Sequence, residues 1–127
     1  MKKLILILLF STVMFSSSSY AGWTKVSESV NGDITYLDYE RIRKHDGYVY
    51  YWNLTDYKKA HASGIWSSKV YYQGDCKLFR IKVLSYSFHN EPMGGGTGTR
   101  KNVPDKEWNY PTPNSSGESV LQSVCNR

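Results

Sequence analysis

The chain contains 127 residues, carries a formal net charge of +5, and is rich in aromatic residues, with eleven tyrosines and four tryptophans. This length fits one small domain and excludes a multidomain architecture. The modest positive charge favours acidic partners or anionic surfaces, but it is too small to indicate nucleic-acid binding.

Residues 1–21 predict a signal peptide that is cleaved on export. A basic start at Lys2 and Lys3 precedes a short apolar run, and small residues stand before Gly22. The apolar run is shorter than the ~20 residues that cross a bilayer, so we expect no membrane span. The mature protein is then a single domain at residues 22–127.

The mature chain opens with a predicted β-hairpin. Residues 23–30 and 34–39 have the pattern of strands, and Asn31-Gly32-Asp33 between them is typical of a tight turn with positive φ angles. The charged residues 40–44 that follow predict either one helical turn or a further piece of strand.

The next predicted strand covers residues 48–57, after a turn at His45-Asp46-Gly47. Alternation divides its side chains between two faces. The set that we expect to face the core is Tyr48, Tyr50, Trp52 and Leu54. The opposite set is amphipathic, and it places Tyr51 at the surface.

A second hairpin is predicted from residue 65 onward. After a polar connection at residues 58–64, residues 65–73 alternate as a strand, and Gly74-Asp75 makes a short turn into residues 76–88. In this last strand the apolar phase changes after Val83. Since a slip of one residue would expose half of the apolar side chains, we expect a β-bulge or sharp bend near Val83-Leu84.

Residues 89–104 are glycine-rich and predict a flexible loop. They lack the Gly-Lys-Ser/Thr sequence and the following helix that a phosphate-binding loop needs. Residues 106–110 then predict a short strand that pairs with the later part of residues 76–88.

A short helix is predicted at the C-terminal end. Ser115 or Ser116 can cap its N-terminus, and Val120, Leu121 and Val124 form an apolar stripe. A helix of this length does not persist alone in water, so it must dock on the sheet.

The chain has two cysteines, Cys76 and Cys125. Export leads to an oxidising compartment, where two cysteines most simply form one disulfide. A disulfide between them would close a loop of about fifty residues and would stabilise the fold by at most ~4 kcal/mol in the chain-entropy model. The predicted bond clamps the helix to the sheet.

No pattern in the sequence indicates catalysis, a metal site or a cofactor. The three histidines, His45, His61 and His89, fall in predicted turns or loops, without metal-ligand spacing, and are expected at the surface. Asp33, Asp38, Glu40 and Asp46 could supply paired carboxylates to a small hydrolase, but carboxylates beside turns more often stabilise those turns. We therefore expect a protein that is not an enzyme.

Recognition of another molecule is the remaining interpretation, because tyrosines that alternate with Arg and Lys suit a binding face. The candidates are nine basic residues: Arg41, Arg43, Lys44, Lys58, Lys59, Arg80, Lys82, Arg100 and Lys101. Solubility alone explains any one of them, and only a cluster in space would favour a site.

Dispersed motifs along the mature chain add a family resemblance. They are Trp23, Tyr36-x-Asp38, Val49-x-x-Trp52, Ser68-Lys69, Asp75-Cys76, Met93-Gly94, Trp108, Pro113-x-Ser115 and Val124-Cys125. In these positions the chain resembles the surface-adhesin protein E family. The resemblance implies a curved six-stranded antiparallel sheet, with a C-terminal helix held on its concave side by a disulfide. It also implies homodimers and adhesion to host matrix proteins such as vitronectin and laminin.

The sequence thus predicts a mainly β (α+β) domain, with a curved antiparallel sheet of about six strands and one clamped C-terminal helix. The predicted function is that of an exported, non-enzymatic binding protein, an adhesin for host extracellular-matrix proteins. A periplasmic inhibitor or chaperone-like module that binds an envelope partner is the alternative. Periplasm, cell surface and secretion all remain open as locations.

Overall fold

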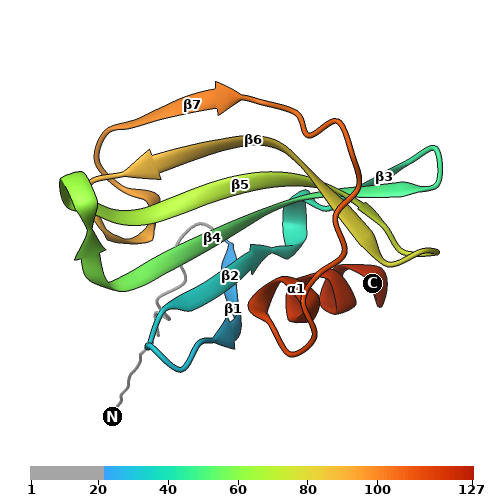
Figure 1. Ribbon diagram of the computed structural model, residues 1–127, viewed down its shortest axis with the longest axis horizontal. Helices are drawn as coiled ribbons and strands as arrows, with labels where there is room; N and C mark the ends of the chain where they lie inside the picture. The colour runs from blue at the N-terminus through green and yellow to red at the C-terminus, as the bar shows by residue number, and fades with distance from the viewer. Residues whose placement is uncertain (1–21) are drawn as a thin grey trace, which may run out of the picture.

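The computed structural model describes residues 22–127, so the predicted signal peptide lies outside the described residues. Seven antiparallel strands form one open sheet in the order β1-β2-β4-β5-β6-β7, with β3 paired to β4 (Figure 1). The strands are β1 (Trp23–Glu28), β2 (Ile34–Asp38), β3 (Arg43–His45), β4 (Tyr48–His61), β5 (Ile65–Asp75), β6 (Arg80–His89) and β7 (Gly98–Asn102). Three short 3₁₀ turns, η1 (Tyr39–Arg41), η2 (Ala62–Gly64) and η3 (Pro92–Gly94), precede the helix α1 (Ser116–Cys125).

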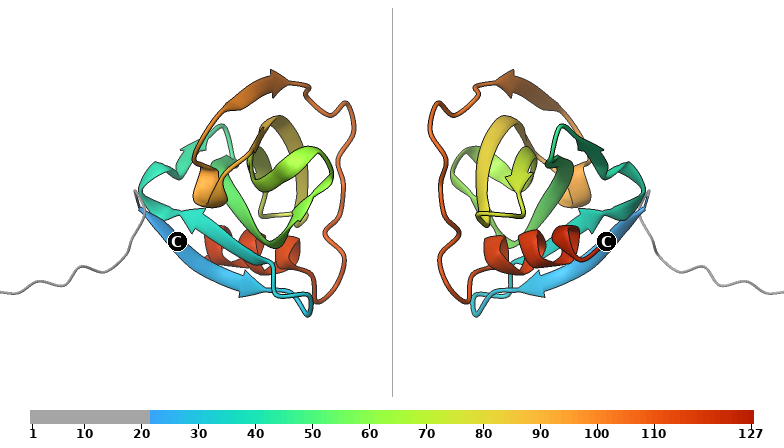
Figure 2. Two further views of the ribbon diagram at one scale, coloured as in Figure 1. Left: turned by 90° about the vertical axis from the view of Figure 1, so that its left-hand side faces the viewer. Right: turned by 90° about the vertical axis from the view of Figure 1, so that its right-hand side faces the viewer.

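The predicted fold class is confirmed: a mostly antiparallel sheet carries one C-terminal helix and a disulfide. Figure 2 shows that the sheet is bent rather than flat, and that α1 lies on one side of it. We call the side that α1 covers the helix face and the opposite side the outer face. The charged segment at residues 40–44 takes both of its predicted forms, since it contributes to η1 and to β3.

The core lies between α1 and the helix face. Val120, Leu121 and Val124 are 0–1% exposed and pack with Leu37 and Tyr51, as the apolar stripe predicted. Full burial of such side chains stabilises the fold by about 1.5–3 kcal/mol each. The predicted cap is also present, because the Ser115 Oγ accepts a hydrogen bond from the Glu118 N–H at 3.1 Å.

The predicted disulfide between Cys76 and Cys125 is confirmed, and it joins residues that are 49 positions apart. The predicted turn at Gly74-Asp75 is wrong, since both residues belong to β5 and the chain turns at residues 76–79. The Asp75 carboxylate explains the shift, because it accepts the backbone N–H groups of Lys77 and Leu78 at 3.0 and 3.2 Å. Cys76 is therefore in a turn and not at the head of a strand.

The predicted core face of β4 is wrong apart from Leu54. Val49 and Tyr51 contact the helix side and are 6% and 1% exposed, whereas Tyr48, Tyr50 and Trp52 lie half-buried on the outer face. Leu54 is buried on the outer face instead, where Gly94 of η3 lies against it. Both faces of β4 carry large apolar side chains, so alternation alone could not identify the one that α1 covers.

The predicted bulge near Val83-Leu84 is confirmed. Tyr72 pairs with Val83 while the adjacent Tyr71 pairs with Ser85, which leaves Leu84 as the extra residue on β6. Because of this extra residue, Val83 and Tyr86 both point to the helix face, so apolar side chains stay on the same face before and after the bulge.

The predicted flexible loop at residues 89–104 is ordered in two places. The η3 turn packs on the sheet, where the Asp56 carboxylate accepts the Met93 N–H at 2.7 Å and the Ser67 Oγ accepts the Gly94 N–H at 2.8 Å. Strand β7 then pairs with the later part of β6. The predicted strand at residues 106–110 is reduced to one bridge between Asn109 and Ile81, so its expected pairing with the later part of β6 is wrong.

The first hairpin also has a longer connection than predicted. β1 ends at Glu28, and the turn is closed by hydrogen bonds between Ser29 and Asp33 and between Gly32 and Ser29. Gly32 has a φ of 91°, but Asn31 does not have a positive φ. The predicted turn at Asn31-Gly32-Asp33 is therefore part of a longer connection, residues 29–33, in which Gly32 alone takes the left-handed conformation.

Candidate binding surface

Aromatic side chains gather on the outer face because β4 and β5 present them in register. Trp52 is opposite Tyr71, with ring centroids 4.8 Å apart, and Tyr50 is 6.4 Å from Tyr71. Trp108 reaches the same face from the segment that follows β7, 5.4 Å from Tyr48. The five rings lie on the outer face in two groups, Tyr48 with Trp108, and Tyr71 with Tyr50 and Trp52. None of these aromatic residues was among the basic residues expected at the site.

Cations lie directly on these rings. The Arg80 guanidinium and the Lys82 ammonium are 4.4 and 4.7 Å from the Trp108 centroid, and the Arg100 guanidinium is 5.1 Å from that of Trp52. Such contacts are worth ~0.5–1 kcal/mol at exposed positions. We call the five rings together with Arg43, Arg80, Lys82 and Arg100 the cation–aromatic face.

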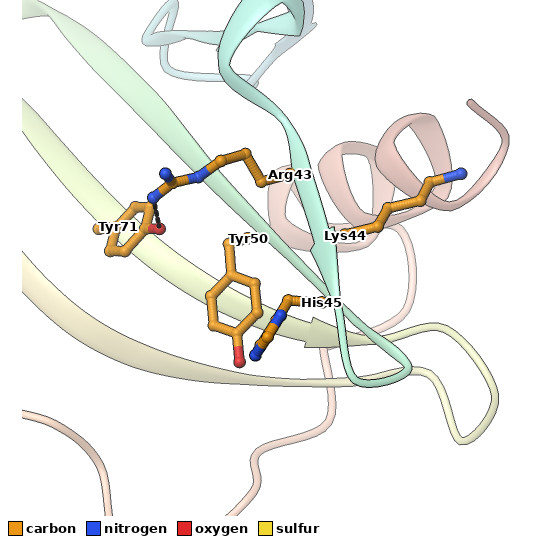
Figure 3. A pocket seen from close by; sticks show the side chains of 5 residues that line it. All are labelled: Arg43, Lys44, His45, Tyr50 and Tyr71. Carbon is orange, nitrogen blue, oxygen red and sulfur yellow. Dashed lines mark hydrogen bonds between the residues drawn. The ribbon is translucent and has the colours of Figure 1, made fainter.

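A hollow of about 320 Å³ opens at one end of this face (Figure 3). Arg43, His45, Tyr50 and Tyr71 point into it, and the Arg43 Nη2 donates a hydrogen bond to the Tyr71 Oη at 3.3 Å. A second hollow shares Arg43 and Tyr71, and it is lined further by Glu40, Arg41 and Trp52. Arg43 and Tyr71 therefore stand between two neighbouring depressions.

The charge of the cation–aromatic face is only partly neutralised. Arg80 forms an ion pair with Asp75 at 2.8 Å. Burial alone would raise the pKa of Asp75, but hydrogen bonds from Arg80 and from two backbone N–H groups hold it below its usual value. Within residues 22–127, Arg43, Lys82 and Arg100 have no carboxylate within 4.0 Å. Three positive charges thus remain available to an anionic ligand.

The other five candidate cations lie away from the rings, although Lys44 and Arg41 also line the first and second hollows. Lys58 and Lys59 are at the far end of β4, beside a separate hollow of about 300 Å³. Lys44 points away from the rings in Figure 3, and its Nζ donates to the Arg127 carbonyl at 3.2 Å. Lys101 pairs with Tyr86 on the helix side, and Arg41 forms an ion pair with Asp38 at 3.4 Å. The structure brings four of the nine candidates together, namely Arg43, Arg80, Lys82 and Arg100.

The histidines do not share a site, and the surface prediction fails for one of them. His89 is 7% exposed, and its Nε2 is 2.8 Å from the Ser87 Oγ. Burial and the charge of Lys69 lower its pKa. His45 and His61 are exposed, in β3 and at the end of β4, so both are in strands rather than loops.

Residues 23–126 match the sequence profile of the surface-adhesin protein E family. The chain belongs to this family. Membership places the protein among surface adhesins. Within residues 22–127, no helix combines the length and hydropathy that a membrane crossing requires.

Solved structures agree with this assignment at the level of the fold. Crystal form II of Haemophilus influenzae protein E has a TM-score of 0.68 and 17% identity, over 92% of this chain and 97% of that chain. Protein E from non-typeable Haemophilus influenzae has a TM-score of 0.63 and 17% identity, over 91% and 83%. A comparison with curated protein sequences found no match. At these identities the likeness shows a common fold and transfers no binding residue.

Proposed function

We propose that the protein is an exported, non-enzymatic adhesin that uses the cation–aromatic face to bind host extracellular-matrix glycoproteins. The observation that carries this proposal is the set of cations without a carboxylate partner, Arg43, Lys82 and Arg100, around half-buried rings on one face. Large aromatic residues and arginine supply most of the binding energy at protein interfaces, so their concentration favours a recognition surface.

The hollows on this face support binding rather than catalysis. Basic and aromatic side chains line them, including one histidine, His45, and Glu40 is the single carboxylate among their lining residues, so neither hollow holds a pair of carboxylates. Two of the four carboxylates that could have supplied a hydrolase are engaged with the backbone: Asp38 accepts the Glu40 N–H at 3.2 Å, and Asp33 accepts the Lys58 N–H at 3.0 Å.

The test is binding of the purified mature protein to immobilised vitronectin and laminin. We expect saturable binding that weakens with salt, since exposed charges are screened within ~8 Å at physiological ionic strength. Arg43→Ala/Arg100→Ala should weaken binding by about tenfold, which corresponds to about 1.4 kcal/mol.

The matched control is Lys58→Ala/Lys59→Ala, which removes the same charge from the far end of β4. It should bind as the unchanged protein does. Equal loss in both variants would contradict a localised site, and flat binding curves for the unchanged protein would contradict the adhesin proposal. In that event, retention of one defined envelope protein would favour the inhibitor or chaperone-like alternative.

A further inference from the structure

We infer that the cation–aromatic face binds a sulfated linear polysaccharide, so that the glycan chains of a matrix glycoprotein, rather than its polypeptide, are what the protein recognises. This inference rests on the proposed function and names the ligand chemistry of the same surface. Its grounds are the spacing of the cations, the presentation of the rings and the length of the face.

The cations are suited to fixed anionic groups. Arg43 and Arg100 present planar guanidinium groups, which bind oxyanions through two parallel N–H donors. Each is already oriented: Arg43 by the hydrogen bond to the Tyr71 Oη at 3.3 Å, and Arg100 by the Ser85 Oγ at 3.3 Å and the Trp52 ring. Lys82 adds a point charge beside Trp108.

The rings are suited to sugars. The face of an aromatic ring carries negative charge density, which attracts the C–H hydrogens on the flat side of a pyranose. Tyr50 and Tyr71 line an open hollow with Arg43 at its rim, so a sugar ring on Tyr50 would have an anionic substituent within reach of a guanidinium. An acidic peptide would satisfy the cations, but it would present no comparable flat apolar surface to the rings.

The shape of the face favours a chain over a single sugar. Tyr48, Tyr50 and Trp52 alternate along β4, so they span about 13 Å at the usual rise per residue. Arg100 lies near the Trp52 end and Arg80 near the Tyr48 end, whereas Arg43 and Lys82 flank the level of Tyr50 from β3 and β6. Cations distributed along and on both sides of a row of rings match a polymer that carries repeated anionic groups.

The experiment titrates the mature protein with a size-defined heparin oligosaccharide and follows tryptophan fluorescence, because Trp52 and Trp108 are on the face. The oligosaccharide should bind and change the emission, whereas its fully desulfated counterpart should bind at least about tenfold more weakly. A plot of log affinity against log salt should have a slope of about −2 to −3, one counterion for each unpaired cation. Equal affinity for the desulfated chain would overturn the inference.

Two variants separate sugar stacking from charge. Arg43→Ala/Arg100→Ala should weaken heparin binding about tenfold or more, and Tyr50→Leu, which keeps an apolar side chain but no ring, should weaken it several-fold at unchanged charge. Lys58→Ala/Lys59→Ala should leave it unchanged. Poly-glutamate or phosphatidylglycerol vesicles that bind as tightly as heparin, and without dependence on Tyr50, would show attraction by charge alone and overturn the inference.

A final arm distinguishes failure of the inference from failure of the proposed function. The immobilised matrix proteins, supplemented with a heparan sulfate proteoglycan, are treated with a heparin lyase before the binding assay. Loss of binding, or competition by free heparin oligosaccharide, supports the polysaccharide ligand. Binding that survives both treatments overturns the inference while leaving the adhesin function intact, and absence of binding to untreated matrix proteins contradicts the proposed function itself.

Discussion

Gly74 is a residue of β5 against which the helix packs closely. A Cβ at this position would lie 3.0 Å from the Leu121 Cδ1, 3.0 Å from the Val49 Cγ2 and 3.1 Å from the Tyr51 Cε1. These contacts are tighter than van der Waals packing allows, so the neighbouring side chains would have to move. The absence of a side chain at Gly74 therefore allows α1 to pack closely against β5.

Gly74→Ala should therefore destabilise the fold by about 1–3 kcal/mol, the usual cost of overpacking a core. Urea denaturation followed by circular dichroism measures the difference. Gly117→Ala is the matched control, since a Cβ there meets only the Ser115 Oγ at 3.7 Å and the residue is helical. It should stabilise by up to about 1 kcal/mol, because alanine favours a helix over glycine. A neutral Gly74→Ala would contradict the close packing.

His89 makes stability depend on pH. Its pKa is lowered, first by burial and then by the charge of Lys69, from the ordinary value of 6.5. The unfolded state therefore binds a proton at His89 at a higher pH than the folded state does. The contribution of neutral His89 to the free energy of unfolding is complete above about pH 6.5, and it is lost as the pH falls from 6.5 towards the lowered pKa. Burial would raise the pKa of Asp75, but hydrogen bonds from Arg80 to Asp75 and from Lys25 to Glu28 lower the pKa values of these two carboxylates from 3.8 and 4.5, so both titrate below this window.

We expect the urea midpoint to decrease between pH 7 and pH 5.5, and to be flatter in His89→Gln, which keeps a polar group near the Ser87 Oγ at the same position. Parallel curves for the two proteins over this range would rule out His89 as the cause. The prediction of a surface histidine failed because residue 89 closes a strand under the glycine-rich segment, where a Cβ on Gly98 would touch the imidazole ring.

At the scale of single elements, the clamped helix is the part that the sequence predicted best. Its apolar stripe, its Ser115 cap and its disulfide are local signals that tertiary structure did not override. The sequence did not predict strand β7, because this strand has no local signal of its own. All five of its residues are exposed, so it has no apolar alternation to detect, and Arg100 and Lys101 are typical of a charged edge strand.

The disulfide should contribute up to about 4 kcal/mol, since it closes a loop of 49 residues in the unfolded chain. Cys76→Ser/Cys125→Ser is expected to lower the urea midpoint, and a reductant should lower the midpoint of the unchanged protein but not that of the variant. Equal midpoints with and without the bond would show that the contacts of Val120, Leu121 and Val124 hold the helix by themselves.

The helix cap gives a smaller and separate effect. Ser115→Ala removes the acceptor for the Glu118 N–H and should cost about 1 kcal/mol. Ser115→Asp, which restores an acceptor and places a negative charge at the helix N-terminus, should recover most of that loss. Hydrogen exchange of the Glu118 amide is the direct measurement, and unchanged protection in Ser115→Ala would contradict the role of the cap.

At the scale of the whole molecule, the sequence predicted the antiparallel sheet and its bulge but not which side of the sheet would be functional. The phase change in β6 could be detected within one strand. By contrast, the exposure of Tyr48, Tyr50 and Trp52 depends on the side that α1 covers, and Tyr and Trp are common both in cores and on binding faces. The cation–aromatic face depends on the register of five strands, β3 to β7, which no pattern within one strand reveals.

The positions of the charged residues, rather than the net charge of the protein, should determine how strongly it binds an anionic surface. Arg43→Glu/Arg100→Glu and Lys58→Glu/Lys59→Glu change the net charge equally. We expect the first variant to elute earlier from a sulfonate cation-exchange column, because it disrupts a face where three cations without a carboxylate partner converge. Coincident elution would mean that the column senses net charge only.

The contact of Arg100 with Trp52, and of Lys82 with Trp108, has a consequence for the thermodynamics of recognition. A free lysine or arginine side chain loses up to about 2 kcal/mol of rotamer entropy when it is fixed. Here the rings restrict these side chains before any ligand arrives, so part of that loss is already incurred on folding. Calorimetry should therefore show a less unfavourable entropy of binding than flexible surface lysines would give, so that modest contacts suffice for attachment.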